Sequence, residues 1–267
     1  MSSSMMDFQH RQQNSFALYL LVLLAITMNS NVVNAQICPD PGMIYPCVCD
    51  ISGMGKMNMF CEGITSTTEL ESLFMQDFPD NNFHILSIDN SYLDILTSGI
   101  LNSKSFEEIT IWQSGLQRVD FGALNSSYNT LSIIRMDVNT LVSFPFEELS
   151  FYTNLIRIDL TGNTLTELST IASDSLEEFF LETNLITHIP VTTFRQLPNV
   201  NTIFLGNNTI EEVLSGTFTG QPNLNILTLN NNRLPELLAG TVELHGPDSR
   251  LIFSNNNISR IEPDAFR

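Results

Sequence analysis

One pattern of apolar and polar positions recurs along most of the chain. It can be written L-x-x-L-x-L-x-x-N-x-L-x-x-L, where L is any apolar residue, and it returns every 21 to 25 residues. Internal repetition at this period is typical of solenoid proteins, whose repeats stack on one another. The eight copies begin at Phe83, Phe106, Leu131, Leu155, Leu176, Val200, Leu224 and Asp248.

Each copy predicts a short strand with one buried face. Side chains alternate along a strand, so the two leucines of Leu-x-Leu point inward and the residue between them points outward. One repeat alone cannot bury its apolar face, so neighbouring repeats must stack to close the core. We therefore expect eight parallel strands in one sheet.

The Asn of the pattern predicts a ladder of side-chain amides where the chain leaves each strand. An amide both donates and accepts hydrogen bonds, so it can satisfy backbone groups that a bend leaves unpaired. The first two repeats have Ser91 and Ser114 at this position. The ladder is predicted to contain Asn139, Asn163, Asn184, Asn208, Asn232 and Asn256.

This pattern resembles the leucine-rich repeat family over residues 83–267. The resemblance implies an α/β solenoid, curved, with the parallel sheet on its concave side and mostly loops and short turns on its convex side. Several repeats add a phenylalanine downstream of the Asn, as in the 24-residue type common in extracellular members. These second apolar anchors are Phe121, Phe146, Phe194, Phe218 and Phe266.

The N-terminal residues predict export. Residues 1–15 are polar, residues 16–28 are mainly apolar, and small residues precede Gln36. Thirteen apolar residues are too few to span a bilayer, which needs about 20. Residues 1–35 are therefore interpreted as a cleaved signal peptide, with a signal anchor or an ordinary buried helix as the alternatives. Later segments contain no apolar run of membrane-spanning length.

Four cysteines form a cluster that agrees with export. Cys38, Cys47, Cys49 and Cys61 lie close together, and the rest of the chain contains no other cysteine. An even set of this kind in an exported chain predicts two disulfides, whereas zinc sites usually contain Cys-x-x-Cys pairs. Pairing Cys47 with Cys49 would strain the bridge, but the spacing alone leaves the connectivity open.

The cysteine segment also resembles the N-terminal cap of the same family. There the first cysteine pairs with the third and the second with the fourth, which implies Cys38–Cys49 and Cys47–Cys61. Residues 36–82 are thus expected to form a cap that includes a helix over residues 66–78, begun by the capping box of Ser66 and Glu69. No cysteine cap follows the repeats at 83–267, which end within a repeat. We expect either a fragment of a longer protein or a covered last repeat.

Charge and composition exclude several functions. The chain has 11 Lys and Arg against 29 Asp and Glu, a formal charge of −18, which argues against nucleic acid as a partner. The histidines are few and show no metal-binding spacing, and no nucleophile or phosphate-binding motif follows a strand. We therefore expect no enzyme, no cofactor and no metal, and interpret pairs such as Glu107-Glu108 as solvated.

The concave face is the best candidate for a binding site. Its central column contains adjacent aromatics, and Arg135 and Asp159 on neighbouring strands are predicted to pair. Exposed aromatics surrounded by charge are typical of protein contact sites, although a solenoid of this length has eight such outward positions in any case. The predicted contact residues are Trp112, Arg135, Asp159, Glu178, Phe180, Glu182 and Phe204.

Three Asn-x-Ser/Thr sequons lie in the repeats, at Asn125, Asn207 and Asn257. In an exported chain each is a candidate for N-glycosylation, with an unused sequon as the alternative. Glycans at Asn207 and Asn257 would lie at the strand exits and keep partners away from that rim.

A closer resemblance narrows the predicted function. The segment from Cys38 to Cys49, the Met57–Cys61 segment and the run ending at Phe78-Pro are similar to an arthropod group of secreted proteins related to the non-catalytic subunit of oplophorus-luciferin 2-monooxygenase. The resemblance implies a secreted, non-catalytic protein-binding scaffold of the kind that accompanies a secreted enzyme as an accessory subunit. The alternative is the ectodomain fragment of a leucine-rich repeat receptor or adhesion protein.

Overall fold

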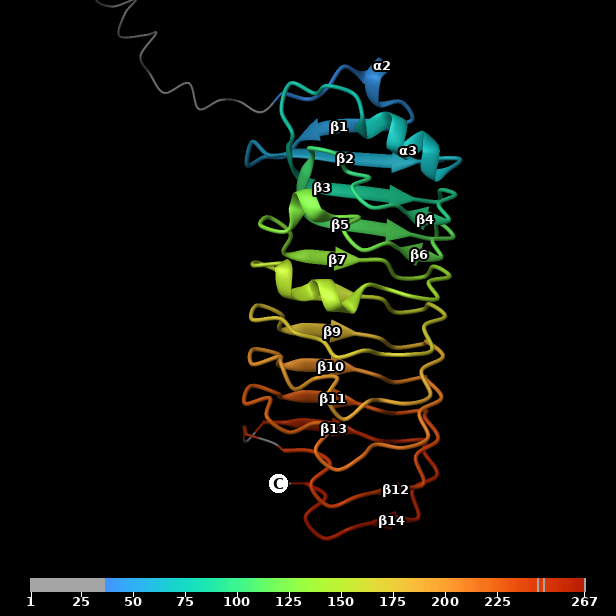
Figure 1. Cartoon of the computed structure of the whole chain (residues 1–267), viewed down its shortest axis with the longest axis vertical. Coiled ribbons are helices and arrows are strands. Elements are labelled where there is room, and N and C mark those ends of the chain that lie inside the picture. Colours follow the sequence, from blue (N-terminus) through green and yellow to red (C-terminus); the bar gives the residue numbers. More distant parts are fainter. Residues whose placement is uncertain (1–36, 244, 247, 267) are drawn as a thin grey trace, which may run out of the picture. The chain divides into compact units, whose positions relative to one another are not determined.

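A computed structural model describes residues 37–243, 245–246 and 248–266 (Figure 1). The predicted signal peptide, residues 1–35, lies outside these described residues. Within the described part, no helix is both long and apolar enough to cross a membrane.

Most strands of the described part form one ladder (Figure 1). The sheet has ten strands in the order β1-β2-β3-β5-β7-β8-β9-β10-β11-β13, and β1 alone runs antiparallel to its neighbour. The predicted solenoid with a parallel sheet is therefore confirmed, with two further strands supplied by the cap. The strands are β1 (Cys47–Ile51), β2 (Met57–Glu62), β3 (Asn82–Asp89), β5 (Ser105–Trp112), β7 (Ile133–Arg135), β8 (Arg157–Asp159), β9 (Glu178–Phe180), β10 (Thr202–Phe204), β11 (Ile226–Thr228) and β13 (Arg250–Ile252).

The segments that return the chain from one strand to the next are mostly loops, as expected. They contain two small parallel pairs, β4 (Ile95–Leu96) with β6 (Arg118–Val119) and β12 (Glu236–Leu237) with β14 (Arg260–Ile261). The short helical segments of the described part are α2 (Pro41–Ile44), α3 (Thr67–Phe74), η1 (Asn125–Ser127) and η2 (Phe146–Phe151).

The predicted asparagine ladder is present, and it is buried except at Asn256, which is half-buried. Asn184 illustrates it: its Oδ1 accepts from the backbone N–H of Leu165 at 3.0 Å, and its Nδ2 donates to the carbonyls of Leu160 and Leu181 at 3.0 and 3.1 Å. One side chain thus bonds the backbone of its own repeat and of the preceding one. Ser114 makes a smaller set, donating its hydroxyl to the Trp112 carbonyl at 2.9 Å.

The second apolar anchor was predicted correctly in three repeats and wrongly in one. Phe146, Phe194 and Phe218 are buried, but Phe121 is 52% exposed. The cause is a shift in phase. The Gly99 N–H donates to the Gly122 carbonyl, and the Gly216 N–H donates in the same way to the Gly240 carbonyl, so these glycines occupy equivalent positions in their repeats. Phe218 lies two residues after Gly216, and the residue two after Gly122 is Leu124. Leu124, not Phe121, is therefore the equivalent of Phe218. Leu124 is indeed buried.

Phe266, the last predicted anchor, forms a parallel bridge with Val242, which in turn bridges Phe218. It therefore holds the register of the anchor column. Its side chain nevertheless remains 40% exposed.

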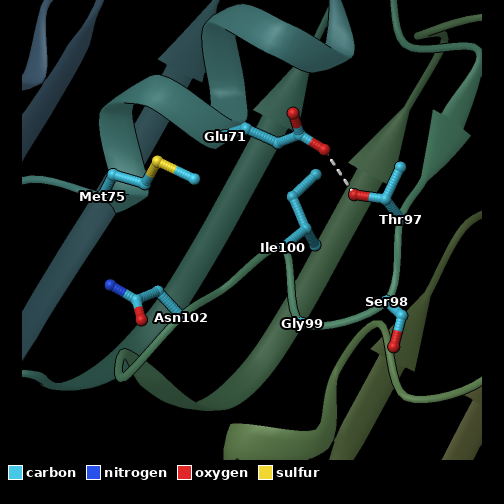
Figure 2. A pocket seen from close by; sticks show the side chains of 7 residues that line it. All are labelled: Glu71, Met75, Thr97, Ser98, Gly99, Ile100 and Asn102. Carbon is cyan, nitrogen blue, oxygen red and sulfur yellow. Dashed lines mark hydrogen bonds between the residues drawn. The ribbon is translucent and has the colours of Figure 1, made fainter.

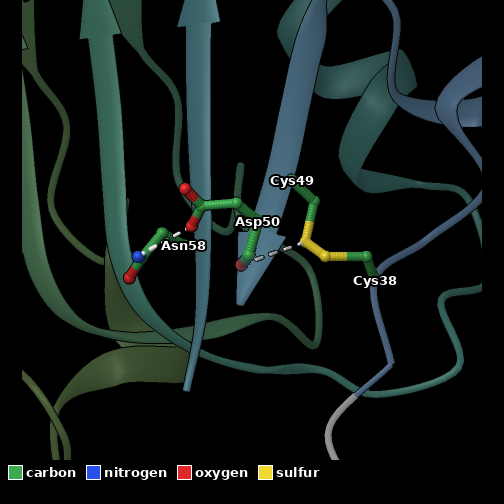
Figure 3. Close-up of a disulfide and its surroundings, with 4 residues drawn as sticks. All are labelled: Cys38, Cys49, Asp50 and Asn58. Atoms are coloured by element: carbon green, nitrogen blue, oxygen red, sulfur yellow. Dashed lines mark hydrogen bonds between the residues drawn. A yellow bond between two sulfur atoms is a disulfide. The ribbon is translucent and has the colours of Figure 1, made fainter. Parts of the chain in front are cut away.

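The cap has the disulfides that the resemblance implied. Cys38 bonds Cys49 (Figure 3), and Cys47 bonds Cys61 across the paired strands β1 and β2. Figure 3 also shows the Asp50 carboxylate, which accepts from the Asn58 amide at 2.9 Å. These links connect the segment before β1 to β1, and β1 to the first parallel strand.

The cap helix begins where predicted and ends earlier. The Ser66 hydroxyl accepts from the Glu69 N–H, and the Glu69 carboxylate accepts from the Thr65 N–H at 2.7 Å, one residue before the expected partner. The helix stops at Phe74, so the predicted extension to Phe78 is wrong. Phe78 instead packs against the core from beyond the helix end.

A buried lysine joins the cap to the repeats. Lys104 is 2% exposed, and its Nζ donates to the Phe74 carbonyl, at the end of α3, at 2.6 Å and also to the Gln76 carbonyl. The same Nζ lies 4.6 Å from the centre of the Phe78 ring. Burial lowers the pKa of Lys104, although the Asp77 carboxylate opposes that change. Carbonyls at a helix end lack hydrogen-bond donors within the helix, and here the Lys104 ammonium is the donor.

A second buried group lies in the return segments of two repeats. The Glu148 side chain is 1% exposed and accepts from the Gly122 N–H at 2.7 Å and from the hydroxyls of Tyr128 and Tyr152 at 2.8 and 3.1 Å. Burial, together with the bond to Glu148 and its charge, raises the pKa of both tyrosines. These three donors satisfy a carboxylate that has no cation beside it.

We expect Lys104→Met to lower the free energy of unfolding by about 2–3 kcal/mol, because the Gln76 carbonyl would lose its donor and the Phe74 carbonyl would keep only the Asn102 amide. Lys56→Met, which changes a half-exposed lysine paired with Glu107, is the control and should cost less than about 1 kcal/mol. Urea denaturation followed by circular dichroism measures both variants. Equal costs would contradict the role assigned to Lys104.

Stability should fall as the pH rises above about 10, the pKa of tyrosine in an unfolded chain. The folded pKa of Tyr128 and Tyr152 is higher, so the unfolded chain releases these protons first and gains population. Urea denaturation midpoints between pH 8 and pH 11 measure the slope of stability against pH. The Tyr128→Phe/Tyr152→Phe variant should have a flatter slope, whereas Tyr45→Phe, at an exposed position, should retain it. Identical slopes would contradict this account.

Candidate protein-binding face

The outward residues of the strands form the central column that the pattern predicts. Strand register aligns them one beside the next, and the column continues into the cap through Val48 and Phe60. The sequence analysis did not include these two, because the repeat pattern begins only at Phe83. The column contains Val48, Phe60, Ser87, Thr110, Arg135, Asp159, Phe180, Phe204, Thr228 and Ile252.

Two phenylalanines lie together in the middle of this face. Phe180 and Phe204 are register neighbours, and their rings meet edge to face with centroids 4.9 Å apart. Both side chains are partly exposed. The guanidinium carbon of Arg157 lies 4.2 Å from the centre of the Phe180 ring, a cation–π contact that holds this ring from one side. The other side of the pair remains open for a contact.

The predicted pair of Arg135 with Asp159 does not form, although the two residues are register neighbours. Arg157 reaches Asp159 at 3.2 Å and Glu178 at 3.3 Å, while Arg135 lies 3.7 Å from Glu108. Arg157 and Asp159 are two residues apart on β8, so they share a face and meet without crossing to another strand.

Partly buried carboxylates lie along one flank of the central column. Burial, and then the negative charge of Asp159, raises the pKa of Asp137 and of Glu182. At Asp137 the positive charges of Arg135 and Arg157 oppose this change without cancelling it. Trp112, 36% exposed, follows the same flank on β5. The flank therefore presents negative charge next to an aromatic ring.

A glycine that the sequence reasoning missed shapes this flank. A Cβ added at Gly206 would stand 2.6 Å from Oδ1 of Asn230 and 3.0 Å from an oxygen of Glu182. The missing side chain at Gly206 thus lets two polar side chains lie against its backbone.

Thr228 also departs from expectation, because it belongs to the outward column and yet is only 5% exposed. Its hydroxyl has no hydrogen-bond partner among the described residues.

One hollow of about 170 Å³ lies between α3 and the loop after β4. Figure 2 shows the residues that line it, among them Glu71, whose carboxylate accepts from the Thr97 hydroxyl. Met75, Ile100 and Asn102 also line it, without a histidine. Among the residues described, no group of three His, Cys, Asp or Glu side chains is placed to hold a metal ion.

The three sequon asparagines are all exposed but have different surroundings. Asn207 has a positive φ of 55°, and its Oδ1 accepts from the Asn231 amide at 2.7 Å, in an outer ladder beside the buried one. Asn125 belongs to η1, and Asn257 follows the last ladder asparagine. Their use as glycosylation sites stays a prediction.

Comparison with known proteins agrees with the repeat geometry. A model of the Leucine rich repeat family matches residues 174–234, the segment that contains β9, β10 and β11. The chain therefore folds as a leucine-rich repeat solenoid. Its fold is similar to that in the crystal structure of a TLR13–ssRNA13 complex (TM-score 0.63, 23% identity, 74% of this chain and 28% of that one). It is also similar to the APL1 leucine-rich repeat domain (TM-score 0.55, 16% identity, 76% and 53%).

The chain also has a sequence relative, as the cap motifs led us to expect. It is 37% identical over 169 residues to the Oplophorus-luciferin 2-monooxygenase non-catalytic subunit of Oplophorus gracilirostris. The match covers 62% of this leucine-rich repeat chain and 47% of the relative, so the chain spans about half of the relative's length.

Replacing Asp137 by Asn should stabilise the protein at neutral pH. The folded pKa of Asp137 is raised, so the unfolded chain releases this proton first and ionisation favours unfolding. The variant should raise the melting temperature at pH 7 by about 1–2 °C and lose this advantage near pH 3, where the carboxyl is protonated in both states. Asp174→Asn, at an exposed position, is the control. A lower melting temperature of Asp137→Asn at pH 7 would contradict the raised pKa of Asp137.

Proposed function

We propose that this chain is a secreted, non-catalytic scaffold that binds another protein through the open face of its sheet. The observation that carries the proposal is the partly exposed pair Phe180 and Phe204, set between ion-paired Arg157 and the carboxylates of Asp137 and Glu182. Aromatic side chains at the centre of a rigid face, with charge around them, are the composition of binding hot spots.

The face also favours a partner of particular chemistry. The negative charge of Asp159 raises the pKa of both Asp137 and Glu182, and the whole chain has a formal charge of −18. A partner that brings lysine or arginine next to an apolar centre would relieve this repulsion on binding. Such complementarity speeds association and selects among partners.

The accessory role is the finer part of the proposal. The relative is by its name the non-catalytic subunit of an oxidising enzyme, which supports a role beside a catalytic partner. The two disulfides of the cap support passage through an oxidising compartment. The contact residues proposed for this role are those of the sheet face, Trp112, Arg135, Asp159, Glu178, Phe180, Glu182 and Phe204.

The direct experiment is capture from the source secretion with tagged mature protein, followed by mass spectrometry. A co-secreted enzyme recovered at one-to-one stoichiometry would support the accessory role. A cell-surface or matrix protein at the same stoichiometry would favour the receptor or adhesion alternative and overturn the accessory role.

The Phe180→Ala/Phe204→Ala variant should weaken binding of the captured partner by about 10- to 100-fold, because two central rings are lost. Isothermal titration calorimetry measures the affinity, and circular dichroism should show unchanged folding. Phe121→Ala, which removes an exposed phenylalanine outside the sheet face, is the matched control. Unaltered affinity in the double variant would rule out this face as the binding site.

A further inference from the structure

A second aromatic cluster lies outside the sheet face, in the segments that return the chain between strands. Phe121 and Phe151 are 52% and 48% exposed, and their rings meet edge to face with centroids 6.0 Å apart. The Tyr128 ring lies 5.5 Å from that of Phe151. Two half-exposed phenylalanines in contact form an apolar patch, which a protein surface in water usually covers.

One sequon asparagine is bonded between the two halves of this cluster. The backbone N–H of Asn125 donates to the carbonyl of Gly122, the residue after Phe121, at 3.3 Å. The carbonyl of Asn125 accepts from the N–H of Tyr128 at 3.4 Å. Phe121, the sequon Asn125-Ser126-Ser127 and Tyr128 therefore occupy one short stretch of backbone, and Phe151 contacts that stretch through its ring.

The side chain of Asn125 is directed toward the same stretch. Its Nδ2 lies 3.9 Å from the point where a Cβ on Gly122 would stand, and Asn125 is exposed. By contrast, the Asn207 side chain is already bonded to Asn231 in the outer ladder. Of these two sequons, only Asn125 is bonded through its backbone to a residue of the aromatic cluster, Tyr128.

We propose that Asn125 carries an N-linked glycan whose first sugar rings pack on Phe121 and Phe151. The donor is a lipid-linked oligosaccharyl diphosphate. The Asn125 Nδ2–C1 bond forms, the C1–O bond to the diphosphate breaks, the amide loses one proton and the lipid diphosphate leaves. A sugar ring presents a face of polarised C–H groups, which is attracted by the negative face of an aromatic ring and excludes water from it.

This inference extends beyond the proposed function, because it concerns a different surface and needs only passage through the secretory route. It assigns different roles to the two exposed aromatic pairs. Phe121 and Phe151 contact the glycan of the same chain, and Phe180 and Phe204 remain available to bind a protein.

The test uses the full chain expressed in cultured eukaryotic cells, with glycopeptides mapped by mass spectrometry from both medium and cell lysate. We expect Asn125 to be occupied. Asn125→Gln should lower the melting temperature by about 2–4 °C and increase the fluorescence of a dye that binds apolar surface. In a Phe121→Ala/Phe151→Ala background the same substitution should change neither quantity. Asn257→Gln, at an exposed sequon, is the control and should leave dye binding unaltered.

Two results would overturn the proposal. The first is an unmodified Asn125 in protein that is glycosylated at Asn257. The second is an equal loss of melting temperature on Asn125→Gln with and without the two phenylalanines, because the sugar would then act independently of the rings. Neither result depends on whether the sheet face binds a protein, so failure here leaves the proposed function standing.

Discussion

The repeats hold together because one amide per turn satisfies the backbone that the turn leaves unpaired. Each ladder asparagine accepts from an N–H of the preceding repeat and donates to carbonyls of its own and the preceding repeat, as Asn184 does. A buried group without a partner costs about 1–3 kcal/mol, so a turn lacking this amide would tend to open. Because the same amide bonds two successive repeats, it sets the distance and the register between them. The straight column of outward side chains is a result of that register.

The binding face depends on the register as well. Phe180 and Phe204 are separated by 24 residues in sequence, yet their rings touch because both follow the same position of the pattern on adjacent strands. A face built this way is rigid, since every side chain projects from a strand whose neighbours are fixed. Rigid aromatic anchors lose little entropy on binding, which suits a scaffold that positions another protein without chemistry of its own.

Much of this architecture could be predicted from sequence, because strands, ladder and column all depend on local spacing. Contacts between side chains far apart in the pattern could not be predicted. Lys104 lies within a loop and gives no signal of its burial, since its partners are carbonyls. Arg157 displaced Arg135 as the partner of Asp159 because the nearer residue on the same strand prevails. Phe121 was misassigned because an apolar residue three positions from the true anchor still fits a loose pattern.

The reversed direction of β1 has a consequence for how the solenoid begins. Every other neighbouring pair in the described sheet is parallel, so each strand there could in principle be followed by another repeat of the same kind. A strand that runs in the direction of the repeats would have to pair antiparallel with β1, with hydrogen bonds arranged differently from those of a parallel pair. The parallel bonding that joins one repeat to the next therefore cannot continue past β1. The two disulfides fix β1 in this orientation, so the cap both covers the first repeat and terminates the stacking.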